Sequence, residues 1–152
     1  MTGERSKDAE YAAAIAALTE LQERQRQAHL SADAGALVAL FANDFMSVQD
    51  GEISRPSRDA SRERFERYFA QVEFIAWDDL DDPVIELSRD GTLATVLVHK
   101  LVHVRFLGAD GTPEEEMTIF AWAETWRRTH SRWELAMVIS TSKDAGHDRA
   151  SS

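Results

Sequence analysis

Two histidines, His99 and His103, stand four positions apart in the run VLVHKLVHVRF, a spacing that raises the question of a metal site. On a helix they would share one face a turn apart, as paired imidazoles that bind zinc do. The flanking residues predict a strand instead, because four β-branched valines between Val96 and Val104 share one parity. Along a strand the imidazoles lie about 13 Å apart, too far for one ion with bonds of roughly 2 Å. The sequence therefore predicts no metal site here.

Glu124, in the run FAWAETWRR, is the strongest candidate for a proton carrier. Pairing the last two predicted strands across residues 129–132 puts it on one face with Trp122, Trp126 and Met137. If these aromatic residues face the cavity, Glu124 sits in apolar surroundings that suit a catalytic acid or base near neutral pH. The alternative is a carboxylate paired with an arginine on a dimer face. One bulge near the turn would exchange the two faces.

The histidines are the other candidates for chemistry. His99 and His103 share a parity opposite to the valines, and either face of that strand could be the core. Each is a candidate base, or else a neutral ring held by one buried hydrogen bond. His29 ends the first predicted helix and is a third candidate.

Composition restricts the class of protein. A chain of 152 residues with 43% hydrophobic and 29% charged residues fits one globular domain. The net charge of −10 argues against nucleic-acid binding, since the arginines between Arg55 and Arg67 alternate with acids as on a solvated helix. No cysteine is present, which excludes thiol chemistry and disulfides. No apolar run resembles a signal peptide or a membrane span, so we expect a cytoplasmic protein.

Helical spacing dominates the chain before Glu73. Apolar residues recur at three and four over Ala9–Leu30, and a second helix, capped by Ser31 or Asp33, ends near Asn43. Asp50-Gly51 predicts a hairpin turn between short strands. A third helix follows Ser57.

After Glu73 the apolar period becomes two. Strands are predicted at residues 74–77, 84–88, 92–106, 117–128 and 133–141, joined by short antiparallel turns. The acidic run WDDLDDP falls in a loop, where Asp78, Asp79, Asp81 and Asp82 read as solvated charge and not as a calcium site. The expected organisation is a single α+β domain over residues 9–142, with disordered tails at 1–8 and 143–152.

Three stretches resemble the nuclear transport factor 2-like superfamily, which includes the SnoaL-like polyketide cyclases and ketosteroid isomerase. They are SADAGALVALFANDFMSVQDG, SRDASRERFERYF and AETWRRTHSRWELAMVIST, and the resemblance spans about residues 9–142. It implies three helices packed on a strongly curved antiparallel sheet, which form a cone with an internal pocket. It also implies a homodimer through the outer sheet face. Functions in the superfamily range from isomerases and dehydratases to pure binding and oligomerisation modules.

The resemblance and the residues together predict a pocket for a small apolar ligand that carries a carbonyl group or a ring. If the protein is an enzyme, the reaction is a proton transfer without cofactor, an isomerisation, dehydration or cyclisation, with Glu124 or a histidine as base. The acid and tyrosine pair of ketosteroid isomerase has no clear counterpart. The alternative is a non-enzymatic dimerisation module whose cone is filled by its own side chains. The predicted pocket lining is Phe41, Phe45, Phe65, Tyr68, Phe69, Trp77, Trp122, Met137 and Ile139.

Overall fold

The computed structural model describes residues 2–149, which form three helices and one six-stranded sheet. This confirms the predicted α+β class. The helices are α1 (Thr2–Leu30), α2 (Ala34–Val38) and α3 (Arg58–Gln71). The strands are β1 (Phe41–Gln49), β2 (Glu52–Ser54), β3 (Val72–Leu87), β4 (Leu93–Leu107), β5 (Pro113–Thr129) and β6 (Arg132–Arg149), in the sheet order β2-β1-β6-β5-β4-β3.

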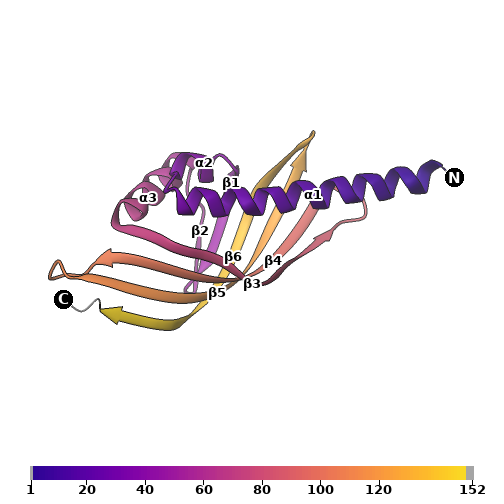
Figure 1. The fold of residues 1–152 in the computed structure, drawn as a ribbon. Helices are drawn as coiled ribbons and strands as arrows, with labels where there is room; N and C mark the ends of the chain where they lie inside the picture. The colour runs from indigo at the N-terminus through magenta and orange to yellow at the C-terminus, as the bar shows by residue number, and fades with distance from the viewer. Residues whose placement is uncertain (1, 150–152) are drawn as a thin grey trace.

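The helices gather on one side of a strongly curved sheet, with α1 lying across the strands (Figure 1). The apolar stripe of α1 packs on the sheet where Leu18 is fully buried. Tyr11, predicted to belong to that stripe, is 52% exposed, because the N-terminal part of α1 extends past the strands (Figure 1). No helix in the described part of the chain is both long enough and apolar enough to cross a bilayer.

The sheet is mixed, whereas the sequence predicted antiparallel pairing. β1 runs parallel to β6, with Met46 opposite Met137 and Val48 opposite Ile139. The hairpin at Asp50-Gly51 is confirmed, and both of its turn residues have positive φ. Short-range turn signals fixed the partner on one side of β1, but nothing local in the sequence identified the distant strand on the other side.

Several element boundaries differ from the prediction. α2 ends at Val38, because the chain from Phe41 onward pairs with β6 and so becomes a strand. The predicted caps are confirmed, since Asp33 accepts a hydrogen bond from the Ala36 amide and Ser57 accepts one from the Ala60 amide. Regular structure also extends into both predicted tails, although residue 1 and residues 150–152 of those tails lie outside the described residues.

The HKLVH run is part of β4, as its alternation predicted. The valine face is the buried one, facing the helices, while His99 and His103 point to the opposite face. The acidic run WDDLDDP is not a loop, because β3 passes through it, with two register shifts against β4 between Asp79 and Val84. These irregularities explain why alternation is hard to see there.

The outer sheet face, away from the helices, carries apolar side chains in one transverse line across all six strands. Each of these residues lies directly opposite one on the adjacent strand. Four of the side chains are more than 40% exposed. We call this line the outer row: Ile53, Val48, Ile139, Ala123, Leu97 and Val84.

Candidate functional site: a polar cluster inside the cone

Glu124 lies on β5 under the helices and is fully buried. Four N–H groups donate to its carboxylate. Trp122 Nε1 reaches Oε2 at 2.7 Å, while Trp126 Nε1, Gln22 Nε2 and Gln25 Nε2 reach Oε1 at 2.8, 2.6 and 3.4 Å. The two indoles come from the same face of β5, two positions to either side, as strand alternation requires. Glu124 is therefore an acceptor in every one of these contacts.

The other two donors, Gln22 and Gln25, come from α1, where the spacing of residues puts them on the face of the helix toward the sheet. Leu18, Gln22, Gln25 and His29 recur at four, three and four, which places them on the face that meets the sheet. Both glutamines are buried. The Glu124 carboxylate thus joins α1 to β5 through hydrogen bonds from Gln22 and Gln25.

Lys100 is the second buried charge of the interior. It occupies the valine parity of β4 between Val98 and Val102, and the residue is only 2% exposed. Its Nζ lies 2.7 Å from Asp79 Oδ1 on β3 and 4.0 Å from the centroid of the Trp77 ring. An ammonium buried at this depth is stable only with such partners, an ion pair and the face of an aromatic ring.

His29 stacks on Trp77, with ring centroids 4.2 Å apart and an interplanar angle of 14°. Its Nδ1 lies 2.7 Å from the Gln25 carbonyl oxygen. Because a carbonyl only accepts, Nδ1 carries the proton and Nε2 keeps a lone pair. Burial lowers the pKa of His29 to about 4, despite the opposing hydrogen bond to Gln25, and the charge of Lys100 acts in the same direction as burial. At neutral pH the ring is uncharged.

We call Gln22, Gln25, His29, Lys100 and Glu124 the interior polar cluster. Aromatic rings surround it. Trp77 and Trp122 lie 5.6 Å apart between ring centroids, and His29 meets Phe69 edge to face at 5.5 Å. The aromatic contacts continue through Phe65, Phe41 and Phe45, while Tyr68 at the rim is 41% exposed.

Of the four residues predicted to carry chemistry, the structure brings His29 and Glu124 into this cluster. His99 and His103 lie on the outer sheet face. There His99 Nδ1 is 2.6 Å from Asp81 Oδ2, and His103 Nε2 is 3.6 Å from Glu115 Oε1. They are separated from the cluster by the sheet itself.

Met137 and Ile139, predicted to line the pocket, also lie on the outer face. Trp126 pairs with Leu135 whereas Thr125 pairs with Met137, so Ala136 is an extra residue that reverses the faces of β6. Leu135, before the bulge, is buried, and Ile139, after it, is 43% exposed. The other seven predicted lining residues lie on the helix side.

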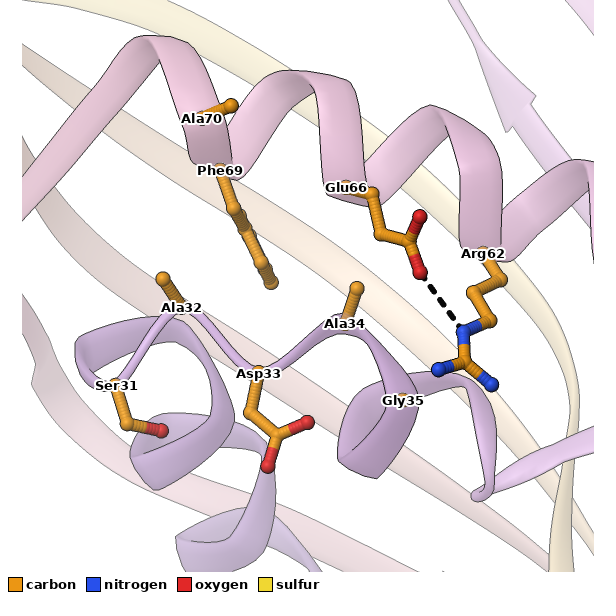
Figure 2. A pocket seen from close by; sticks show the side chains of 9 residues that line it. All are labelled: Ser31, Ala32, Asp33, Ala34, Gly35, Arg62, Glu66, Phe69 and Ala70. Atoms are coloured by element: carbon orange, nitrogen blue, oxygen red, sulfur yellow. Dashed lines mark hydrogen bonds and ion pairs between the residues drawn. The ribbon is translucent and has the colours of Figure 1, made fainter.

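Among the surface cavities formed by residues 2–149, two lie away from the cluster. The larger, about 510 Å³, lies between the α1–α2 junction and α3, beside the Arg62–Glu66 ion pair (Figure 2). The smaller, about 410 Å³, lies between α1 and the start of β6 around Trp133. Neither is lined by a member of the interior polar cluster, and Phe69 is the predicted pocket residue that borders the larger one.

Sequence reasoning missed Lys100, Gln22 and Gln25. The signal for Lys100 was a charged residue at the apolar parity of an otherwise valine-rich strand. The signal for the glutamines was their spacing, because Gln22 and Gln25 follow Leu18 at intervals of four and three residues and so continue the apolar stripe of the helix. Both patterns mark polar groups that must find buried partners.

The acidic run is engaged in ion pairs. Asp78 pairs with Arg26 at 3.3 Å and Asp79 with Lys100, while Asp81 is hydrogen-bonded to His99. Within residues 2–149 no group of three or more histidines or carboxylates is arranged to hold a metal ion.

Comparison with solved structures shows that the chain has the nuclear transport factor 2-like fold, as the resemblance predicted. The hexachlorocyclohexane dehydrochlorinase LinA type 3 from Novosphingobium barchaimii matches over 95% of this chain and 94% of its own, with a TM-score of 0.72 and 12% identity. A nuclear transport factor 2-like protein from Cytophaga hutchinsonii matches over 84% and 96%, with a TM-score of 0.66 and 13% identity. A Mycobacterium tuberculosis protein of unknown function matches over 90% and 75%, with a TM-score of 0.70 and 18% identity. No protein-family model and no curated protein matches the sequence.

Replacing Glu124 by glutamine should destabilise the fold. The new amide turns an acceptor oxygen into an N–H₂ donor that must face an indole or amide N–H, so we expect a loss of about 3 kcal/mol in the free energy of unfolding. Urea denaturation measures it. Glu52→Gln, the same change on the exposed hairpin, should stay within about 0.5 kcal/mol of the parent protein. Equal effects at the two sites would show that the four donors contribute nothing.

His29 should make stability depend on pH. The unfolded chain binds a proton there near pH 6.5 and the folded chain only near 4, so the unfolded state holds more protons in between. Stability should therefore fall as pH decreases through this window, by about 3 kcal/mol in total. Urea denaturation at several pH values, compared with His29→Phe, isolates the effect because the carboxylates titrate in both proteins. Parallel pH profiles for the two proteins would contradict it.

Proposed function

We propose that the protein binds a small organic molecule inside the cone, a ring-shaped compound with a carbonyl or carboxylate oxygen that approaches Lys100. The observation that carries this proposal is the burial of a lysine ammonium and an uncharged histidine against the same indole, Trp77. A core needs neither group for stability, because an apolar pair of similar volume would serve at least as well.

The chemistry of these groups suits such a ligand. The aromatic rings around the cluster offer flat apolar surface to a planar or cyclic compound. Lys100 has three N–H donors, of which the Asp79 contact uses one, so it can also donate to a ligand oxygen. The dehydrochlorinase of the same fold acts on hexachlorocyclohexane, itself an apolar ring.

Turnover, if it occurs, would be a proton transfer without a cofactor. His29 Nε2 would accept a proton from the carbon next to the ligand carbonyl, and Lys100 would stabilise the resulting enolate oxygen. The low pKa keeps His29 unprotonated at neutral pH but also makes it a weak base. The ligand would therefore need an acidic C–H bond, as on a carbon beside a carbonyl whose oxygen contacts Lys100. Glu124, with four donors on it, would hold α1 in place.

Binding can be tested with an indanone whose carbonyl lies in the middle of its five-membered ring. Titration followed by NMR should shift the indole N–H signals of Trp77 and Trp122, and Lys100→Met should weaken binding by about tenfold through loss of one charged hydrogen bond. Indane, which has the same rings without the oxygen, should bind equally weakly to both proteins.

The control variant is Lys143→Met, a lysine on the exposed end of β6. It should leave the affinity unchanged. Shifts confined to residues around the cavity of Figure 2, or no shifts at all, would refute binding inside the cone.

A second candidate function is assembly of two copies through the outer sheet face. The outer row supports it, since four large apolar side chains are exposed in one line that no helix covers. Contiguous apolar surface of this kind is typical of interfaces.

Sedimentation analysis at high micromolar concentration should find a dimer. Leu97→Glu, which places a carboxylate in the outer row, should convert the dimer to a monomer, because each copy would bury an unpaired charge in the interface. Leu107→Glu, at the end of β4 outside the outer row, changes a leucine that is still more exposed (70% against 52% for Leu97) and should leave the dimer intact. A monomeric parent protein would rule out this function.

A further inference from the structure

We infer that the ligand of the proposed site carries an N–H or O–H donor on its ring, and that this donor hydrogen-bonds to Gln22 Oε1. The inference rests on the proposed function and adds a second polar requirement to it, beyond the oxygen that approaches Lys100.

Gln22 Oε1 is a buried oxygen that lacks a hydrogen-bond partner, the one such side-chain atom in the described part of the chain. The residue is 8% exposed. An amide oxygen that gives up water without gaining a donor is destabilising, and nearly all buried polar atoms avoid it. A partner that arrives with a ligand would account for its retention.

Turning the amide over does not solve the problem. The Gln22 amide nitrogen donates to Glu124 at 2.6 Å, and a reversed amide would bring its oxygen against the carboxylate instead. The orientation of the side chain is therefore fixed by the charge that it faces.

The ring N–H donors near Gln22 are already used, and Gln22 and Gln25 each direct an amide N–H at Glu124. Both indole N–H groups and the Gln25 amide donate to Glu124, and His29 Nδ1 donates to a backbone carbonyl. Acceptor capacity remains around Gln22, since Glu124 Oε2 accepts from Trp122 alone while Oε1 accepts from three groups. A lactam or heteroaromatic N–H would satisfy Gln22 Oε1 as a donor and would place no further acceptor beside these oxygens.

Trp122 lies near both proposed ligand contacts, the oxygen that approaches Lys100 and the donor that reaches Gln22 Oε1. Its Nε1 donates to the carboxylate that holds Gln22, and its ring lies 6.0 Å from Lys100 Nζ. One bicyclic compound lying along Trp122 would offer an oxygen to Lys100 and a donor to Gln22.

Oxindole is the probe, because it carries a ring N–H next to its carbonyl. Its matched partner is the indanone used above, in which a methylene group replaces that N–H. We expect oxindole to bind the parent protein about tenfold more tightly than the indanone, as one added hydrogen bond to a buried acceptor provides. In Gln22→Met the two affinities should agree within about twofold.

Gln25→Met is the matched control, since it removes a donor to the same Glu124 oxygen but leaves Gln22 Oε1 in place. It should keep the preference for oxindole. If Gln22→Met does not fold, a crystal structure of the parent protein with oxindole decides, with the ring nitrogen expected within hydrogen-bond distance of Gln22 Oε1.

Equal affinity of the two probes for the parent protein, with both bound inside the cone, would overturn this inference and leave the proposed function standing. The same holds for a preference that survives in Gln22→Met, or for a crystal structure with water on Gln22 Oε1 and the oxindole nitrogen elsewhere. Failure of both probes to enter the cone would overturn the two proposals together.

Discussion

A single buried carboxylate fixes how the helices sit on the sheet. Glu124 is removed from water, so its two oxygens must be supplied with donors, and β5 can provide only the indoles of Trp122 and Trp126. The remaining two come from α1. Apolar packing alone would tolerate some sliding and rotation of a helix, whereas directed hydrogen bonds do not. The position of His29, one turn after Gln25, follows from that constraint.

The interior holds a basic and an acidic side chain, Lys100 and Glu124, which have separate partners and do not pair with each other. Lys100 pairs with Asp79, which is partly exposed, and Glu124 is satisfied by neutral N–H groups. The indole of Trp122 lies between them, donating to one and lying 6.0 Å from the other. Each charge thus keeps a fixed position and orientation. Preorganised dipoles and charges of this kind are what recognition and catalysis in a dry site require.

Much of the fold could be predicted from the sequence because it depends on local signals. The change of period near Glu73, the Asp50-Gly51 turn and the caps at Asp33 and Ser57 all lie within a few residues of what they determine. The pairing of β1 with β6 and the bulge at Ala136 depend on contacts between distant segments, and so they escaped prediction. The same distinction applies to the site. Glu124 was recognisable among tryptophans, but its glutamine partners become visible only when α1 is laid over β5.

The parallel pairing of β1 with β6 has a consequence for how the chain reaches this structure. β1 finds its inner neighbour only after almost the whole polypeptide is available, because Phe41 lies opposite Leu135. Contacts that join such distant segments require closure of a long loop before they contribute stability, and they slow folding. On the ribosome, the early helices and the first hairpin would emerge well before the strand that completes their sheet. Until then the inner edge of β1 is unpaired, which makes this interval the one in which chaperone binding and aggregation compete with folding.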